Sequence, residues 1–295
     1  MNMSYPPFYP VTTKSPNAND IAAAAMHIIK VIATVLGAVA ALAVAAPPLF
    51  AQPAPIAPAL QAAVAGPHRE SANRLRDRYR HPLETLAFFG IREDMTVIEI
   101  SPGAGWYSEI LGPLLYDKGR LILAGGATAG LRARVTDKAG VLGRASLVEF
   151  RPPVFWPPQG DATQTPQGAD MVLTFRNVHN WISAGTVEAV FSGMYRALKA
   201  GGVLGVVEHR ANPALPVDPR AGNGYVHEAQ VIAFAEAAGF RLSARSEVNA
   251  NPSDTKDYPG GVWTLPPTLR MGGVERDRYL AIGESDRMTL RFVKP

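Results

Sequence analysis

The alternation of short apolar strands with helical segments is the feature that most constrains the fold of this chain. Runs rich in β-branched and aliphatic residues recur along it, and most are followed by a stretch with apolar residues at helical spacing. The predicted strands cover residues 96–100, 120–124, 146–150, 169–174, 203–207, 241–248 and 288–293. Strands that alternate with helices in this way predict a mostly parallel sheet with helices on both faces, which is an α/β fold.

The predicted strand ends point to one edge of that sheet. In open parallel sheets, ligands bind beyond the carboxyl ends of the strands. Four strand ends fall at residues 99–105, 124–126, 175–181 and 208–211. Three of them carry polar or aromatic side chains, whereas 124–126 carries only small residues. We therefore expect the functional site at this edge.

The strongest local motif is a glycine-rich turn, Ser101-Pro102-Gly103-Ala104-Gly105, between a predicted strand and a predicted helix. Glycine has no Cβ, so a ligand can approach the backbone closely. The helix that follows offers free N–H groups to an anionic group. The turn predicts a nucleotide-type ligand, although a purely structural βα turn remains open.

Two cofactor classes compete for this turn. The pattern Gly103-x-Gly105-x-x-Ser108 is close to a dinucleotide fingerprint, which expects an acidic residue at the end of the next strand. That strand ends in Leu123-Ala124-Gly125-Gly126, without a carboxylate. The acid lies instead on the first strand, at Glu99, as in the methyltransferase pattern.

From about residue 74 to residue 295, the chain resembles the class I S-adenosylmethionine (SAM)-dependent methyltransferases. It looks most like a bacterial group of predicted methyltransferases that carry signal peptides. The resemblance rests on FFGI at 88–91, VIEISPGAGWY at 97–107, RNVHNW at 176–181, LKAGG at 198–202, EHR at 208–210, AGF at 238–240 and ESDRM at 284–288. It implies a Rossmann-like sheet of seven strands, mostly parallel, with the last strand antiparallel.

The resemblance also implies SAM as the cofactor, bound at the glycine turn. The residues expected to hold it are Glu99, Ser101, Pro102, Gly103, Gly105, Trp106, Tyr107 and Asn177. Aromatic faces such as those of Trp106 and Tyr107 attract a sulfonium cation. Two positions depart from the family: Ser101 replaces a usual glycine, and Ala124-Gly125 replaces the acid that holds the ribose hydroxyls.

A cluster of histidines predicts acid–base chemistry beside the turn. His179 follows the fourth strand and is our candidate general base, because histidine titrates near neutral pH. If the sheet order follows the family, Glu208 and His209 face it from the fifth strand, and we assign them catalytic roles as well. A metal site formed by these three residues is conceivable, but their spacing matches no known signature, so no metal is predicted.

The predicted substrate-binding residues are Asn180, Trp181, Tyr225 and Trp263. Each aromatic residue among them also fits a role in core packing.

The composition of the chain limits the classes of molecule that it is expected to bind. The 295 residues carry a formal net charge of +4, and the charges are interspersed. The one basic run, Arg74, Arg76, Arg78 and Arg80, is interpreted as the solvated start of a helix, with a phosphate- or nucleic-acid-binding patch as the alternative. We therefore predict a small-molecule substrate and no nucleic-acid partner. The chain has no cysteine, which excludes disulfides, cysteine nucleophiles and thiolate metal sites.

The first 51 residues have the layout of an export signal. Lys30 precedes an apolar run over residues 31–46, which is followed by a small residue, Ala51, before Gln52. We expect cleavage after Ala51 or Ala45, and a periplasmic product that meets the membrane only transiently. A retained membrane anchor and a true start at Met26 are alternatives. Residues 52–69 are predicted to be an Ala/Pro linker, and residues 70–295 the α/β domain.

The sequence therefore predicts methyl transfer from SAM to a small acceptor. The alternative is an exported protein that keeps the fold, has lost methyltransferase activity and acts as a ligand-binding protein. A nicotinamide-dependent oxidoreductase is a third hypothesis, because the turn is close to the dinucleotide fingerprint.

Overall fold

A computed structural model describes residues 56–150 and 168–295. The predicted signal segment and the Pro-rich segment 151–167 lie outside these residues. In the described part of the chain, no helix has the length and apolar character needed to cross a membrane.

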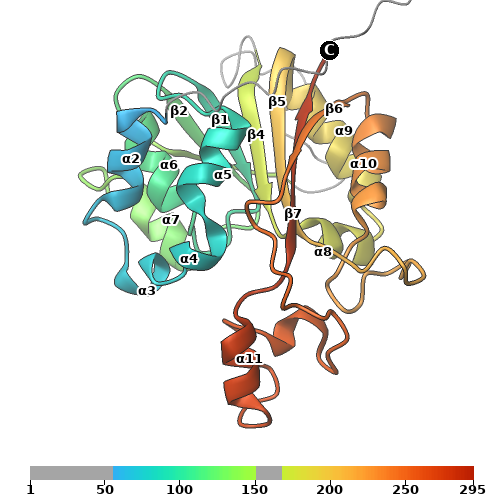
Figure 1. Ribbon diagram of the computed structural model, residues 1–295. Helices are drawn as coiled ribbons and strands as arrows, with labels where there is room; N and C mark the ends of the chain where they lie inside the picture. Colours follow the sequence, from blue (N-terminus) through green and yellow to red (C-terminus); the bar gives the residue numbers. More distant parts are fainter. Residues whose placement is uncertain (1–55, 151–167) are drawn as a thin grey trace, which may run out of the picture. The chain divides into compact units, whose positions relative to one another are not determined.

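The sheet has seven strands in the order β3-β2-β1-β4-β5-β7-β6 (Figure 1). The neighbours from β3 to β5 pair in parallel, and β7 runs antiparallel to both β5 and β6. This confirms the predicted Rossmann-like methyltransferase fold with an antiparallel last strand. The strands are β1 (Thr96–Ile100), β2 (Arg120–Ala124), β3 (Ser146–Val148), β4 (Ala169–Phe175), β5 (Leu198–His209), β6 (Arg241–Ser246) and β7 (Arg287–Val293).

Helices cover both faces of the sheet (Figure 1). They are α2 (Pro58–Ala65), α3 (Ser71–Arg74), α4 (Asp77–Arg80), α5 (Pro82–Phe89), α6 (Ser108–Leu115), α7 (Ala129–Thr136), α8 (Val178–Ser183), α9 (Val187–Ala197), α10 (Glu228–Ala237) and α11 (Arg276–Ile282), with a 3₁₀ turn η1 (Gly261–Thr264). Leu86, Phe89 and Leu111 pack on one face, and Phe191 and Val231 pack on the other.

The side chains of the central strands alternate between these two cores. On β1, Val97 belongs to the core under α5 and α6, whereas Ile98 belongs to the core under α9 and α10. Successive side chains of a strand point to opposite faces, so an unbroken apolar run serves both cores at once. This is why the central strands contain so few polar residues.

The predicted linker over residues 52–69 is corrected by α2. Pro58 occupies the first turn of this helix, where a missing N–H costs nothing. Leu60 and Ala63 are buried one turn apart and pack in the same core as α6. The composition of this alanine-rich segment is typical of a linker. Its high helix propensity nevertheless lets it form a helix, which packs against the core through Leu60 and Ala63.

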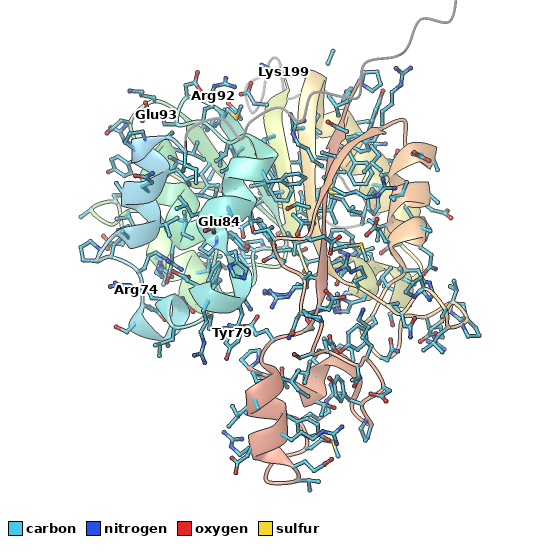
Figure 2. The ribbon with its side chains drawn as sticks, in the orientation of Figure 1. Arg74, Tyr79, Glu84, Arg92, Glu93 and Lys199 are labelled. Carbon is cyan, nitrogen blue, oxygen red and sulfur yellow. The ribbon has the colours of Figure 1, made fainter. Side chains whose placement is uncertain are left out.

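The carboxyl ends of the parallel strands lie at the opposite side of the molecule from their amino ends. Arg92, Glu93 and Lys199 lie at the end where the parallel strands begin, whereas Arg74 and Tyr79 lie toward the end where they finish (Figure 2). The chain proceeds from β1 outward to β2 and β3, and then returns to β4 on the other side of β1. The carboxyl ends of β1 and β4 therefore form the switch point at which such sheets bind ligands.

Gly205 provides a test of the sheet packing. A Cβ at this position of β5 would lie 2.7 Å from Leu173 Cδ2 and 2.8 Å from Phe89 Cγ. We expect Gly205→Ala to lower the free energy of unfolding by roughly 1–3 kcal/mol in urea titrations. The matched control is Gly130→Ala in α7, where a Cβ meets nothing within 4 Å. It should be neutral or stabilising by up to about 1 kcal/mol, and equal losses in both variants would contradict the packing described.

Candidate active site

Two cavities open at the carboxyl edge of the sheet. The first, of about 240 Å³, is lined by the glycine turn, Glu99 and the aromatic residues Trp106, Tyr107 and Phe175. The second, of about 340 Å³, is lined by His179, Asn180, His209, Trp263 and Glu284, among others. Arg76, Arg80 and Arg176 line both cavities, so the two are neighbours that share a cationic wall.

The two glycines of the turn serve different purposes. Gly103 has a φ of +60°, lines the first cavity, and would carry a Cβ that meets nothing within 4 Å. Gly105 has a φ of +85°, but its Cβ would lie 2.7 Å from Leu131 Cδ1. The turn is thus open to a ligand at Gly103 and closed by packing at Gly105. Gly105 does not line the first cavity, and its contact with the cofactor stays a prediction.

Ser101 adopts a φ of +53°, in the left-handed region that favours glycine. Its backbone therefore matches the usual glycine of the resembling family, even though its side chain does not. Ser101 and Pro102 both line the first cavity.

The end of β2 has no room for the acid that the family usually places there. Ala124 is fully buried, and a Cβ at Gly125 would lie 2.5 Å from the carbonyl oxygen of Phe150. Next to it, the Thr128 N–H donates a 2.9 Å hydrogen bond to the carbonyl oxygen of Gly103. A side chain at Gly125 would thus clash with the backbone of Phe150, and the loop after β2 is bonded to the glycine turn.

Glu99 is buried beneath the first cavity, and Ser108 Oγ donates a 2.6 Å hydrogen bond to its carboxyl group. Burial raises the pKa of Glu99 to about 8, although this hydrogen bond and the charge of Arg176 act in the opposite direction. Glu99 therefore enters the site as a neutral acid at neutral pH. Asn177 braces the same region: its side-chain amide donates to the carbonyl oxygen of Ile100 over 3.2 Å.

The aromatic residues of the turn are already engaged by the protein. Trp106 has the guanidinium groups of Arg69 and Arg80 over its ring at 5.1 and 4.7 Å. Tyr107 stacks on Phe175 with ring centroids 3.5 Å apart. Both aromatic side chains are at least nine-tenths buried. Their predicted contact with a sulfonium is limited to whatever ring surface these partners leave at the wall of the first cavity.

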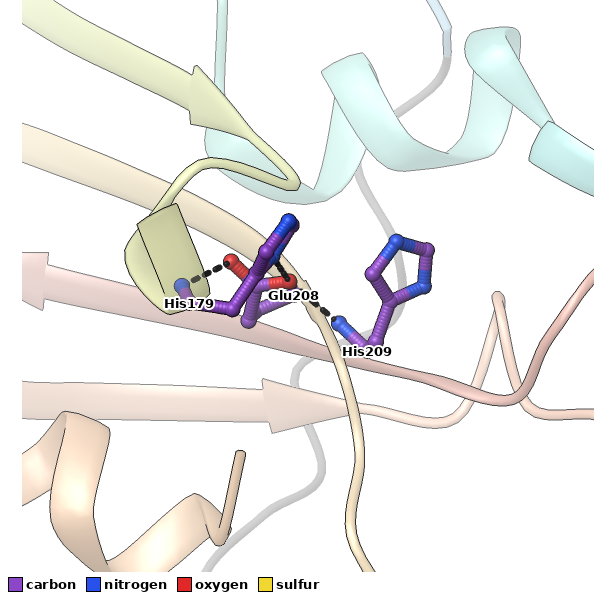
Figure 3. Close-up of side chains that lie close together, drawn as sticks. All are labelled: His179, Glu208 and His209. Carbon is purple, nitrogen blue, oxygen red and sulfur yellow. Dashed lines mark hydrogen bonds and ion pairs between the residues drawn. The ribbon is translucent and has the colours of Figure 1, made fainter. Parts of the chain in front are cut away.

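His179, Glu208 and His209 come together at the ends of β4 and β5, as predicted (Figure 3). His179 Nδ1 lies 3.0 Å from Glu208 Oε1. The Glu208 carboxylate also accepts backbone N–H bonds from Val178 at 2.5 Å and from His209 at 2.8 Å. A carboxylate that accepts from Nδ1–H fixes the tautomer of the imidazole and leaves Nε2 as an acceptor.

His209 lies beside this pair, with its ring centroid 5.5 Å from that of His179. Its Nδ1 is 2.6 Å from Ser285 Oγ. Burial lowers the pKa of His209 well below its usual value, and the nearby charges of His179, Arg176 and Arg287 lower it further. His209 is therefore neutral at physiological pH.

One ligand atom from each of these three residues lies within 4.8 Å of the others, so the geometry alone admits a metal ion. The electrostatics oppose one. Glu208 is already committed to hydrogen bonds from its neighbours, and Arg80 and Arg176 line the same cavity. A cation would have to displace those bonds against a positive field.

The four predicted substrate residues divide into two pairs. Asn180 and Trp263 line the second cavity, and the Trp263 ring lies edge-on to His179 at 5.9 Å. Trp181 instead packs edge-on against Phe191. Tyr225 is buried, and its hydroxyl donates to the Asp254 carboxylate at 3.0 Å. Trp181 and Tyr225 line neither cavity, so the structure does not bring them together with Asn180 and Trp263.

The arginines are the main feature that the sequence did not reveal. Arg76 and Arg80 had been interpreted as part of a solvated run, but Arg80 is only 2% exposed and both line the site. Their spacing of four residues places them on one side of the α3–α4 segment. That spacing is the signal that separates them from Arg74, which is exposed.

Glu284, just before β7, holds these arginines. Its carboxylate lies 2.6 Å from Arg76 Nε, 3.0 Å from Arg80 Nε and 2.9 Å from Arg287 Nη2. Burial alone would raise the pKa of Glu284, but the charges of Arg287, Arg80 and Arg76 outweigh it and hold the pKa at about 2. The carboxylate is therefore permanently charged, and one negative charge faces several positive ones.

No protein-family model matches the chain, and neither does any curated protein. Solved structures do match it. A SAM-dependent methyltransferase from Aquifex aeolicus has 15% identity and a TM-score of 0.50, with 75% of this chain and 93% of that chain covered. The [4+2]-cyclase SpnF has 16% identity and a TM-score of 0.52, covering 78% and 86%. The glycopeptide N-methyltransferase MtfA, solved with S-adenosylhomocysteine (SAH), has 14% identity and a TM-score of 0.45, covering 74% and 90%.

At these identities, the comparisons show that this chain has the fold of the class I SAM-dependent methyltransferases. One matched structure is a cyclase and another a methyltransferase, so the fold does not fix the reaction. The activity has to be argued from the residues at the site.

The buried acid gives a test by pH. Glu99 keeps its proton in the folded state up to about pH 8, whereas the unfolded chain releases it near the ordinary glutamate pKa of 4.5. Between these values the folded state binds more protons, so the free energy of unfolding falls as the pH rises, by up to about 1.4 kcal/mol per unit. Glu99→Gln removes this contribution. In urea unfolding at about pH 5 and about pH 8, the variant should gain stability relative to the wild type as the pH rises. A constant difference would contradict a raised pKa.

Proposed function

We propose that this protein transfers a methyl group from SAM to a small acceptor, with His179 as the general base. The observation that carries the proposal is the juxtaposition of an open glycine turn with a carboxylate-oriented histidine at the switch point of a methyltransferase fold. The first cavity would take the cofactor and the second the acceptor.

The residues that fit the cofactor are those of the turn. Gly103 exposes its backbone to the first cavity without a Cβ, and Ser101, Pro102 and the neutral Glu99 complete that wall. SAM, when bound, supplies an electrophilic methyl group.

The protein's own contribution is proton transfer and positioning. Glu208 accepts from His179 Nδ1–H and holds the ring, so that Nε2 is available to accept the proton from a hydroxyl or amine of the acceptor. The imidazolium that forms is stabilised by the same carboxylate. His209, neutral and bonded to Ser285, adds a second polar group to the acceptor cavity.

The proposal is tested by binding SAH to the purified chain in calorimetry. Gly103→Ala places a methyl group in the first cavity and should weaken SAH binding by tenfold or more. Gly130→Ala, which lies outside both cavities, should bind SAH like the wild type. Thermal unfolding checks that the Gly103 variant folds, because its positive φ costs about 1–2 kcal/mol with a side chain. Failure of the wild type to bind SAH would rule out the methyltransferase function.

The base is tested separately. His179→Gln should leave SAH binding unchanged and slow the release of SAH during turnover by roughly 10²–10⁴-fold. His227→Asn keeps a capping residue at the start of α10, away from both cavities, and should retain the wild-type rate. A His179 variant with the wild-type rate would exclude this residue as the base.

A second candidate function has its own structural support. The loop after β2 is bonded to Gly103 and leaves no room for a ribose-binding acid, which favours a protein that keeps the fold and binds a different ligand. This alternative predicts no SAH binding to the wild type. Export of the protein to the periplasm remains a prediction from the first 51 residues, which lie outside the described part of the chain.

A further inference from the structure

The wall shared by the two cavities contains more positive charge than the protein neutralises. Arg76, Arg80 and Arg176 line both cavities, and Glu284 is the acidic residue that lines the second one with them. Arg287 is also buried, and its Nη2 forms an ion pair with Oε2 of Glu284 at 2.9 Å. Several guanidinium groups therefore compete for one carboxylate.

The hydrogen bonds of these arginines are incomplete. Arg76 Nη2 and Arg80 Nη1 are buried, and no residue in the described part of the chain accepts from them. Arg80 as a whole is 2% exposed, so bulk water does not solvate its free N–H groups. A buried guanidinium with unpaired donors costs free energy unless another acceptor reaches it.

The position of Arg176 is set by its backbone conformation and by one backbone hydrogen bond. It follows β4 with a φ of +61°, and its N–H donates to the carbonyl oxygen of Val207 over 2.7 Å. Among residues 56–150 and 168–295, its side chain has no hydrogen bond or ion pair. A left-handed conformation thus places a guanidinium at the wall of both cavities, where, within the described residues, the charge of Glu284 lies nearby but no side chain bonds to it directly. Burial and the charge of Arg287 lower the pKa of Arg176 to about 10, so it is still protonated at neutral pH.

We propose that Arg76, Arg80 and Arg176 bind an oxyanion, a carboxylate or a phosphate, carried by the methyl acceptor in the second cavity. Planar guanidinium groups match both oxyanions with paired hydrogen bonds. The identity of the acceptor class rests on the proposed methyltransferase function, whereas the anion site does not.

The rest of the second cavity limits what the oxyanion is attached to. Val262, Trp263, Pro266 and Pro267 form the apolar part of the lining, and the Trp263 ring lies edge-on to His179 with ring centroids 5.9 Å apart. A molecule that fits has an anionic end, a compact apolar body and a hydroxyl or amine within reach of His179. The volume of about 340 Å³ suits a small organic acid rather than a polymer.

The test uses the purified chain and two simple probes, benzoate and inorganic phosphate, in calorimetry. Arg176→Gln should weaken binding of at least one probe by tenfold or more. Because the Arg176 side chain makes no hydrogen bond or ion pair within the described residues and its charge adds to that of Arg287, this variant should unfold at the same temperature as the wild type or higher. Arg76→Gln should weaken binding too, with some loss of stability, since it pairs with Glu284. Arg176→Lys keeps the charge but not the paired donors, so its affinity for the probe should lie between those of the wild type and Arg176→Gln.

The matched control is Arg74→Gln, in the same arginine run but exposed and outside both cavities (Figure 2). It should bind both probes like the wild type. Equal loss in the Arg74 variant would show that general surface charge attracts the probes, and would overturn the site. No binding of either probe to the wild type, or wild-type binding in the Arg176 and Arg76 variants, would overturn it as well.

SAH separates this proposal from the proposed function. Probe binding that persists when the chain is saturated with SAH supports an acceptor site. Displacement of the probe by SAH would mean that the arginines hold the carboxylate of the cofactor, and would overturn the assignment to the acceptor. If the chain binds a probe through Arg176 but does not bind SAH, the anion site stands and the methyltransferase function fails.

Discussion

The buried carboxylate of Glu208 is the interaction on which the site depends. It lies at the end of β5, yet its bonds go to the backbone of Val178 and to the ring of His179, both just after β4. A buried carboxylate has to be matched by donors, and these donors happen to be the groups that need orientation. The packing requirement of one side chain therefore sets the position of the candidate base.

A second constraint comes from Glu284 and its arginines. One carboxylate of low pKa draws Arg76, Arg80 and Arg287 together from segments more than 200 residues apart. Such a cluster stabilises the fold less than its number of ion pairs suggests, because the arginines repel one another and are costly to desolvate. Its retention in a cavity wall is easier to understand if it serves to bind a charge from outside.

The sequence predicted those parts of the molecule that follow from local pattern. Apolar periodicity defined the strands, and the rule that parallel strands end at one edge brought His179, Glu208 and His209 together correctly. What escaped prediction depends on neighbours distant in the chain. The difference between Gly103 and Gly105 arises from Leu131, and the burial of Arg80 arises from Glu284. Residue type alone placed Trp181 and Tyr225 at the site, but Trp181 packs against Phe191 and the buried Tyr225 bonds to Asp254.

The antiparallel direction of β7 has a consequence for how the site is completed. Because this strand enters the sheet from the carboxyl edge, Glu284 and Ser285 reach the cavities only when β7 inserts between β5 and β6. The segments that carry Arg76, Arg80 and Arg176 are all made earlier, and their mutual repulsion is uncompensated until then. A chain interrupted before residue 284 would keep the three arginines and lose the carboxylate of Glu284, so the charge balance of the pocket depends on the segment that also supplies a strand to the interior of the sheet.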